Sequence, residues 1–373
     1  MREYSIFKTK ISDILTFEIE YAILSEYLSD LFFRSLTVEG DCKIMQRERI
    51  SENVYWFQSE IYAQVTAGVI IGPQWAVVVD TLALPEEAQE IRKFVTETIG
   101  VPIRYLVNTH FHADHAWGNC FFPGATIIAH TLCAKYLKEI GIPALEETKK
   151  QNPSFLNSHI VLPHLTFSHG ELILKIGKKN LIIMLTPGHT ADGISVFVEE
   201  DRVLFAGDAF LPIPQLNEGD YRQSIDVIRK IGDMGLENII QGHGDIVLRG
   251  EIDDAVQENI KYIENIHEIA RKATKRRNPA EFLNEYNIEA CGKSRVYMGG
   301  LAEQLNKRNL IWMFKQVVAE EGLPKSDDEY EDEPEEDDFE DMLPNSDTLP
   351  DDYETPGDED DFYDSDEDFD DDF

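Results

Sequence analysis

The pattern of apolar and polar positions changes at about residue 50, where short apolar runs begin. Three of these runs predict strands: Val54–Phe57, Gly68–Ile71 and Trp75–Val79. Pro85 then opens a predicted helix that extends to about Ile99, with acidic residues in its first turn. Strand and helix patterns alternate from there to about residue 250. This alternation, with its short hairpin runs, predicts an α/β fold: an αββα sandwich of two facing sheets with helices outside.

Helical spacing of apolar residues dominates on both sides of this predicted sandwich. Residues 1–42 predict an amphipathic helical extension, which fits a packing arm, an oligomer contact or an extension upstream of the true start. After residue 250 the pattern is helical again, chiefly over Ala255–Thr274 and Gly300–Val318. We therefore divide the chain into four parts: a helical extension (1–42), a sandwich domain (43–250), a C-terminal helical region (251–323) and a tail (324–373).

The tail carries most of the net charge of −37. From Ser326 onward it holds 27 of the 71 acidic residues and no lysine or arginine, which leaves 44 acids against 34 bases elsewhere. Such a composition predicts disorder, and it would repel nucleic acid and anionic membranes. The tail fits a solvated segment, a weak sponge for divalent ions, or an arm that docks a basic protein. In the last case Phe339, Phe362 and Phe369 would be the anchors.

The cysteines and the apolar stretches predict the compartment. Four cysteines, Cys42, Cys120, Cys133 and Cys291, contain no CxxC pair, which is typical of reduced thiols in a cytosolic protein. The first residues lack the apolar core of a signal peptide, and no stretch approaches the roughly 20 apolar residues of a transmembrane helix. We expect a cytoplasmic protein, with leaderless export as an open alternative, and a homodimer as one oligomeric state.

Candidate chemistry is concentrated at residues 110–115, His-Phe-His-Ala-Asp-His, directly after an apolar run. Imidazole and carboxylate are good ligands for zinc and similar divalent ions. Alternate residues of an extended segment point the same way, so His110 and His112 could reach one ion. Asp114 and His115, past the bend, could reach a second. The alternative is that these are three ordinary surface histidines in a loop. The further candidate ligands downstream argue against it.

Three more metal-ligand residue types each follow an apolar run and lie beside a glycine: His189, Asp208 and His243. Ligands that come from loops at one edge of a sheet show this arrangement, because the strands are rigid and the glycines permit sharp turns. Each of these residues alone is a weak signal, since a lone Gly-His-Gly is more often a turn. Together with the hexapeptide they predict a metal site.

With these residues the chain resembles the hydrolases of the metallo-β-lactamase fold over roughly residues 50–250. The resemblance matches the HxHxDH motif at residues 110–115, followed by His189, Asp208 and His243. It implies one ion held by His110, His112 and His189, and a second held by Asp114, His115 and His243. Asp208 would bridge the two ions. The family's early aspartate matches Asp80, which would support the ligands from behind by orienting a histidine.

Two bound divalent ions, zinc first and iron or manganese as alternatives, would share a water and lower its pKa towards neutrality. The resulting bridging hydroxide would attack an electrophilic centre, with Asp114 as both ligand and candidate proton shuttle. Asp208 and His115 depart from the β-lactamases of the family, and Leu211 replaces their substrate-binding lysine. We therefore expect a small ester, thioester or lactone as substrate, with a β-lactamase-like amide hydrolase as alternative.

A different class of function on the same fold is a di-iron redox protein, which normally carries a glutamate ligand and a flavodoxin domain; neither is present in this sequence.

Other polar residues have simpler interpretations. Asn108 and Thr109 are expected to fix the first ligand loop by hydrogen bonds, and Asp192 to brace its own loop. His130 is expected at a strand end, and Tyr221 in packing.

Overall fold

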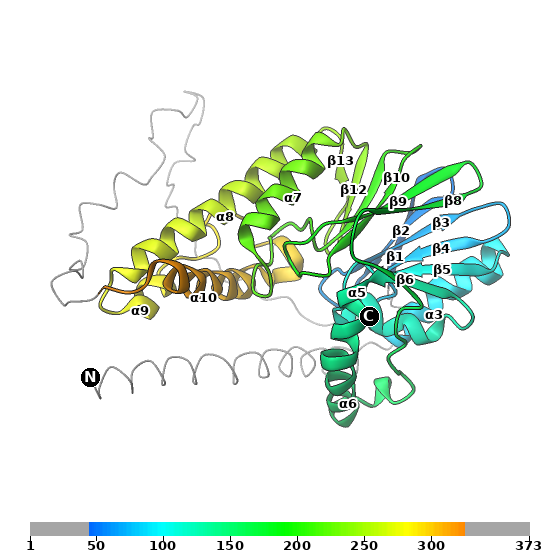
Figure 1. Cartoon of the computed structure of the whole chain (residues 1–373), viewed down its shortest axis with the longest axis horizontal. Helices are drawn as coiled ribbons and strands as arrows, with labels where there is room; N and C mark the ends of the chain where they lie inside the picture. The colour runs from blue at the N-terminus through cyan, green and yellow to red at the C-terminus, as the bar shows by residue number, and fades with distance from the viewer. Residues whose placement is uncertain (1–44, 325–373) are drawn as a thin grey trace, which may run out of the picture. The chain divides into compact units, whose positions relative to one another are not determined.

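The computed structural model describes residues 45–324. The predicted helical extension (1–42), Cys42 and nearly all of the predicted acidic tail lie outside these residues. Two β-sheets face each other, with helices on both outer sides (Figure 1). The prediction of an αββα sandwich is therefore confirmed.

The first sheet contains seven strands in chain order. Its first four strands pair antiparallel, and the pairs β4–β5, β5–β6 and β6–β7 are parallel. Its strands are β1 (Met45–Ser51), β2 (Val54–Ser59), β3 (Thr66–Ile71), β4 (Ala76–Val79), β5 (Ile103–Val107), β6 (Thr126–His130) and β7 (Leu165–Phe167).

The second sheet contains six strands in the order β13-β12-β11-β10-β9-β8. Only β11 and β12 pair in parallel, and the other pairs are antiparallel. Its strands are β8 (Glu171–Ile176), β9 (Lys179–Leu185), β10 (Ile194–Val198), β11 (Val203–Gly207), β12 (Asn238–Gln241) and β13 (Val247–Leu248).

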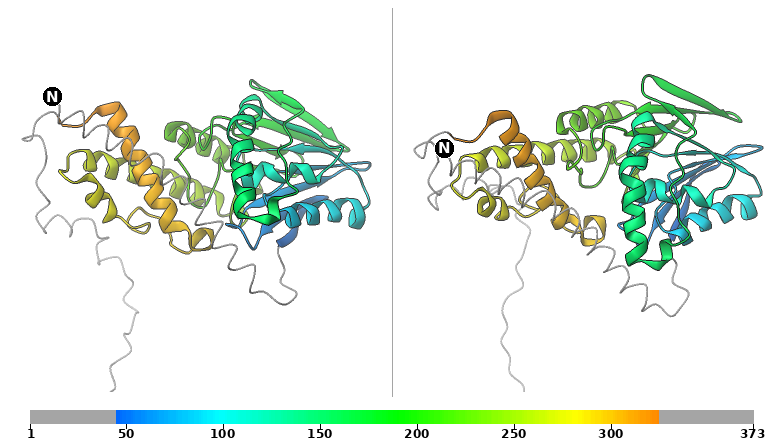
Figure 2. Two further views of the ribbon diagram at one scale, coloured as in Figure 1. Left: turned by 90° about the horizontal axis from the view of Figure 1, so that it is seen from below. Right: turned by 60° about the horizontal axis from the view of Figure 1, so that its bottom comes forward.

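Helices cover both sheets and continue past the second one (Figures 1 and 2). The α-helices are α3 (Pro85–Lys93), α4 (Ala113–Ala116), α5 (Thr131–Tyr136), α6 (Ile142–Gln151), α7 (Tyr221–Asp233), α8 (Ile252–Thr274), α9 (Pro279–Asn284) and α10 (Ala302–Glu321). The shorter helical segments are η1 (Phe94–Ile99), η2 (Trp117–Phe121), η3 (Leu137–Gly141), η4 (Pro153–Phe155) and η5 (Tyr297–Gly300). Within residues 45–324 no helix has the length and apolar character needed to cross a bilayer.

Side chains alternate between two cores along each central strand, as the strand period of two requires. In β4, Val77 points between the sheets, whereas Val78 packs under α3. In β11, Phe205 points between the sheets, whereas Leu204 packs against α7 and α8. Residue 68 must be glycine for this packing, because a Cβ there would lie 2.2 Å from Phe205 Cε1.

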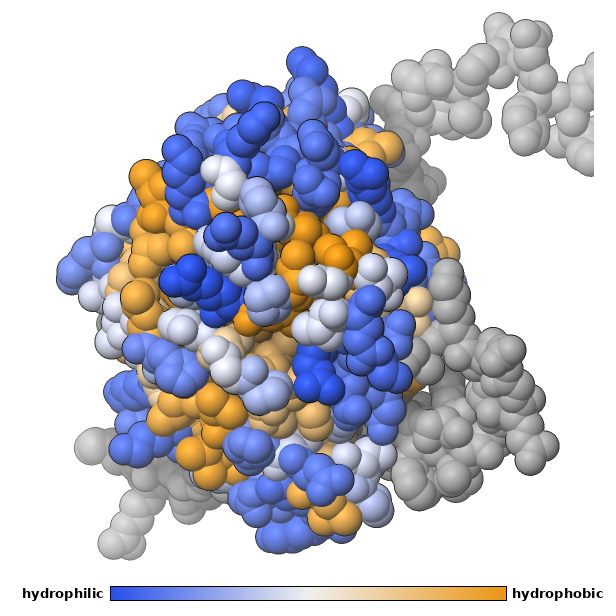
Figure 3. All heavy atoms as spheres, turned by 90° about the vertical axis from the view of Figure 1, so that its right-hand side faces the viewer, coloured by the Kyte–Doolittle hydropathy of each residue, from blue (hydrophilic) through white to orange (hydrophobic). Residues whose placement is uncertain are grey.

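The molecule also carries apolar side chains on its surface. On the face shown in Figure 3, apolar and charged residues are interspersed. Ile173 in β8 is 64% exposed and Leu165 in β7 is 41% exposed, and these two strands end the sheet orders at the same side of the sandwich. Single exposed apolar residues of this kind are ordinary in folded proteins.

One acidic side chain in α3 is completely buried. Glu87 has no exposed surface, and its carboxyl group lies next to the Ser59 hydroxyl at the end of β2. Burial raises the pKa of Glu87 from 4.5 to about 7, because the charged form loses its hydration. The folded protein therefore holds this proton more tightly than the unfolded chain does.

We predict that this proton makes stability fall as pH rises. The contribution of Glu87 is fully present below its unfolded pKa near 4.5 and is lost through about pH 7. Glu87→Gln has no carboxyl group to titrate, so its stability should not fall in this way. From pH 5 to 8 the unfolding free energy of the wild type should therefore drop by up to ~3 kcal/mol more than that of the variant. Urea unfolding at both pH values measures this difference. Glu90→Gln, an exposed position on the same helix, should show none.

Candidate metal centre

The candidate ligands all lie just beyond the carboxyl ends of strands. His110 and His112 follow β5, and Asp114 and His115 lie in the short helix α4. From the second sheet, His189 follows β9, Asp208 follows β11 and His243 follows β12. Because β9, β11 and β12 run in the same direction, their carboxyl ends share one edge of that sheet. The two sheets thus bring residues that are more than 130 positions apart to one place.

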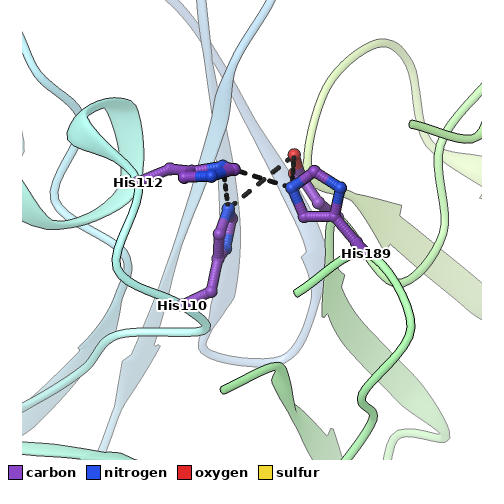
Figure 4. Close-up of side chains that lie close together, drawn as sticks. His110, His112 and His189 are labelled. Atoms are coloured by element: carbon purple, nitrogen blue, oxygen red, sulfur yellow. Dashed lines mark hydrogen bonds and ion pairs between the residues drawn. The ribbon is translucent and has the colours of Figure 1, made fainter. Parts of the chain in front are cut away.

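The structure gathers these seven residues into two groups, and within each group the candidate ligand atoms lie within 4.8 Å of one another. One group contains His110, His112, His189 and Asp208, and the other contains Asp114, His115 and His243. In Figure 4 the rings of His110, His112 and His189 point towards one another from two separate loops. The division is the one that the family resemblance implies.

Asp208 lies between the two groups. Its Oδ2 is 3.3 Å from His189 Nε2 and 3.8 Å from His110 Nε2 in the first group. In the second group, His115 Nε2 is 3.2 Å from Oδ1, and His243 Nε2 is 3.7 Å from Oδ2. A Cβ at residue 242 would lie 1.9 Å from Asp208 Oδ1, so the glycine there gives the carboxylate its space.

The residues fit metal ions. His115 Nε2 and Asp208 Oδ1 are buried and face the site, and apart from their contact with each other at 3.2 Å neither makes a hydrogen bond within residues 45–324. Unsatisfied buried polar atoms are rare, and an ion is one common explanation for them. Five imidazoles and two carboxylates are a donor set that suits zinc, iron or manganese. The contacts do not distinguish among these metals.

Each candidate histidine contacts a second group through its other ring nitrogen, and such a contact selects the tautomer that leaves the inner nitrogen free. His112 alone presents Nδ1 to the site, and its Nε2 contacts Glu218 at 3.0 Å. The other contacts are His110 Nδ1 with Thr109 Oγ1 (3.1 Å), His115 Nδ1 with Asp80 Oδ2 (2.9 Å), His189 Nδ1 with the Gln215 carbonyl (3.0 Å) and His243 Nδ1 with the Ala63 carbonyl (2.9 Å).

Asp80 connects the two ligand loops from behind. Its carboxylate accepts hydrogen bonds from the Thr109 backbone N–H and from the Thr109 hydroxyl, both at 2.7 Å, in addition to its contact with His115. Its φ of 57° lies in the left-handed region, which costs energy for a residue with a Cβ. Asn108 adds hydrogen bonds to the His115 carbonyl and to Asn119. The expected bracing by Asn108 and Thr109 is confirmed.

The electrostatics of the cluster favour charged carboxylates and divide the histidines: for His112, His115 and His243, neighbouring carboxylates outweigh burial and raise the pKa, whereas the pKa of the other two is lowered. Burial lowers the pKa of His110, and the neighbouring His115 and His112 lower it further. Burial also lowers the pKa of His189. For Asp114, burial raises the pKa, but His115 and His243 outweigh it and bring the pKa to about 2. Unprotonated histidine and ionised aspartate are the forms that bind metal ions.

Two other polar residues match their simpler interpretations, whereas the bracing role of Asp192 stays a prediction, because its buried carboxylate oxygens make no hydrogen bond within residues 45–324. His130 ends β6, and its ring Nδ1 accepts a hydrogen bond from the Leu132 N–H at the start of α5. Tyr221 stacks on His267 with ring centroids 5.1 Å apart, so it packs. Asp192 is fully buried beside Thr190 and Cys133, and burial raises its pKa.

A cavity of about 210 Å³ opens beside the two groups. His112, Asp114, Asp208 and His243 line its inner end. The facing wall comes from the segment around α10 and the loop before α7. That wall is formed by Gln215, Glu218, Met298, Leu301, Gln304, Leu305 and Arg308. A substrate in this cavity would therefore touch both the candidate metal ligands and the C-terminal helical region.

Residues 62–243 match the family model of the metallo-beta-lactamase superfamily. The domain formed by these residues belongs to this superfamily. The match begins in the loop whose Ala63 carbonyl contacts His243, and it ends at His243 itself. It therefore includes all seven candidate ligands and Asp80. The C-terminal wall of the cavity lies beyond it.

Known relatives of this metallo-β-lactamase domain match about half of the chain. A beta-lactamase-like protein 2 homolog of Caenorhabditis elegans is 27% identical over 46% of this chain, which spans 51% of that protein. The acyl-coenzyme A thioesterase MBLAC2 of Gallus gallus is 24% identical over 52% of this chain and 78% of its own length. A metallo-beta-lactamase family protein of Thermus thermophilus shares the fold, with a TM-score of 0.55 and 15% identity over 76% of this chain and 98% of its own.

Sequence reasoning missed the wall of the cavity. Glu218 contacts a candidate ligand through its side chain, and Arg308 faces the cavity from α10. The basic residues Lys272, Lys275, Arg276 and Arg277, which are close together in the sequence, do not line this cavity. Glu218 carries a weak local signal, since it directly precedes a glycine in the loop that follows Asp208. Arg308 carries none, because only the tertiary fold brings α10 to the site.

We predict that Asp80→Asn weakens metal binding in the metallo-β-lactamase domain. The amide cannot accept all the hydrogen bonds of Asp80, so His115 loses its orientation, and such losses reduce metal affinity roughly 10- to 100-fold. Zinc titration against a chromophoric chelator measures the affinity of each site. The weakened ion should be the one near His115. Equal affinity in the variant would contradict the role of Asp80. Asp233→Asn, at an exposed position, is the matched control.

Proposed function

We propose that the chain is a dinuclear metal-dependent hydrolase, with zinc as the preferred metal, that cleaves a thioester bond within the wider class of esters, thioesters and lactones. The observation that carries this proposal is the cavity that joins the ligand groups to an apolar wall and an arginine. Both ligand groups are built from side chains that hold divalent ions in hydrolytic sites. His110, His112 and His189 form one binding group, Asp114, His115 and His243 the other, and Asp208 serves both.

Two bound ions would supply an activated water at neutral pH and polarise the bond under attack. The protein's own groups do the rest. Asp114 faces the cavity with its carboxylate, so it is placed to accept a proton from the attacking water and to pass it towards the leaving group. Asp80 and Glu218 keep His115 and His112 in their tautomers. Met298 and Leu301 exclude water from one side.

The wall of the cavity supports a thioester with an apolar acyl group. Met298, Leu301 and Leu305 present an apolar surface that fits an alkyl chain, since burial of such a chain is favourable. Arg308, on the same wall, interacts electrostatically with Glu218 but forms no close salt bridge within residues 45–324, so an anionic group of the carrier could contact its guanidinium. The similarity to an acyl-coenzyme A thioesterase supports the same substrate class.

We expect the zinc-loaded protein to hydrolyse an acyl thioester in a panel that also contains a lactone, a β-lactam and a phosphodiester. Asp208→Ala should reduce turnover to background, because it removes the carboxylate that serves both ligand groups. Metal content and thermal unfolding of the variant show whether it lost ions or its fold. Preference for the β-lactam would favour the β-lactamase-like alternative. If the protein binds two ions but hydrolyses none of the four substrates, that result would contradict hydrolysis of these classes.

The variant Arg308→Met tests whether Arg308 recognises an anionic group of the carrier. We predict that it raises KM for an acyl thioester of an anionic carrier by roughly 10-fold or more, because a hydrogen bond to a charged group is lost, and leaves kcat nearly unchanged. KM for an acyl thioester of an uncharged thiol should not change. Lys307→Met, the exposed neighbour, removes the same charge and should have no effect. An equal rise in KM for both carriers would mean that Arg308 does not recognise the anion.

A further inference from the structure

A second cavity of about 310 Å³ lies next to the metal centre. It is bounded by the loop after β12, by α8 and by the segment at residues 293–298. Met298 belongs to the walls of both cavities, and Gly244, in the second, directly follows His243 in the first. None of the seven candidate metal ligands lines the second cavity. It is therefore separate from the proposed hydrolytic site.

Lys293 lines this second cavity and is buried in an unusual way. Its side chain is 3% exposed, whereas lysine is almost never fully buried unless it is paired. Its contacts in the described part of the chain are Glu258 Oε2 at 3.4 Å and the face of Tyr297, whose centroid is 5.9 Å away. The Glu258 side chain is 55% exposed, so water screens this pair. The ammonium group can therefore accommodate a further anionic partner.

Asn259 supplies an independent observation. Its side chain is buried, and its Nδ2 donates a hydrogen bond to the Leu211 carbonyl at 3.0 Å. Its Oδ1 is also buried but makes no hydrogen bond within residues 45–324. Buried carbonyl oxygens are almost always satisfied, so this one leaves an acceptor beside the cavity for a donor from a bound water or a ligand.

The remaining wall has two kinds of surface. Leu211, Pro212 and Met298 are apolar, while the carboxylates of Asp245 and Glu258 lie at the edge that Val296, 75% exposed, leaves open to solvent. A ligand that satisfies all of these groups carries a carboxylate for Lys293, an N–H donor for Asn259 and a positive charge for the carboxylates. It also carries a short apolar group.

We propose that this second cavity binds an α-amino acid with an apolar side chain. The α-carboxylate contacts Lys293, and the α-ammonium donates to Asn259 Oδ1 and faces Asp245 and Glu258. The side chain packs against Leu211 and Met298. This inference goes beyond the proposed hydrolysis and does not depend on it, because none of the contacts involves a metal ligand.

Isothermal titration calorimetry of the full chain with L-leucine tests the proposal. Two matched ligands each lack one charged group: 4-methylpentanoate lacks the amine, and 3-methylbutylamine lacks the carboxylate. We expect leucine to bind at least about tenfold more tightly than either, because each lost group removes a charge-assisted hydrogen bond. Absence of leucine binding, or equal affinities for the three ligands, would overturn the proposal.

A pair of variants locates the site. Lys293→Met keeps the length of the side chain and removes its charge, so it should weaken leucine binding at least about tenfold. Lys261→Met makes the same change at an exposed position of α8 and should not alter the affinity. Unchanged leucine affinity in folded Lys293→Met would overturn the assignment. If that variant does not fold, as thermal unfolding would show, the three-ligand comparison on the unmodified chain decides the matter.

Discussion

The rest of the site depends on one constraint: a single buried carboxylate must serve four histidines that come from both sheets. Asp208 meets it only because β11 ends where β5, β9 and β12 also end, and because residue 242 is a glycine. Seven polar side chains crowded in this way would repel or remain unsatisfied in a dry interior. The seven side chains are held in place by the contacts of the outer ring nitrogens of the five histidines and by the buried hydrogen bonds of Asp80. The sheets need not rearrange to keep these side chains together.

The parts of the fold and of the site that could be predicted are those whose signals lie within a few neighbouring residues of the sequence. The strands, the helix that begins at Pro85 and the ligand positions carry signals within a few residues: an apolar run, a turn-forming glycine, a spacing of two. The sandwich and a metal site could therefore be predicted, whereas the division of all seven ligands into two groups came from the family resemblance. Glu218 and Arg308 could not, because no local pattern shows that α10 and the loop before α7 face the ligands. Nor does any pattern near Lys293 show that its ammonium group is buried.

The C-terminal helices thus have more than a covering role. Figures 1 and 2 show α8 extending away from the second sheet, with α7 and α10 packed along it. The match to the superfamily ends at residue 243, before α8 and α10 begin. The ligands come from the shared domain, whereas the residues that would select a substrate come from the region outside it. Similarity within the shared domain therefore constrains the chemistry more strongly than it constrains the substrate.

The two cavities meet at a backbone that is itself under constraint. Met298 has a φ of 57°, and Gly299 and Gly300 continue in the left-handed region. For a residue with a Cβ this conformation costs free energy, and such strain persists only where the surrounding structure enforces it. Here the burial of the Met298 side chain, 2% exposed in the apolar core of the second sheet and its helices, offsets the cost. Because Met298 lines both cavities, this constrained and buried side chain separates the Lys293 cavity from the cavity beside the metal centre.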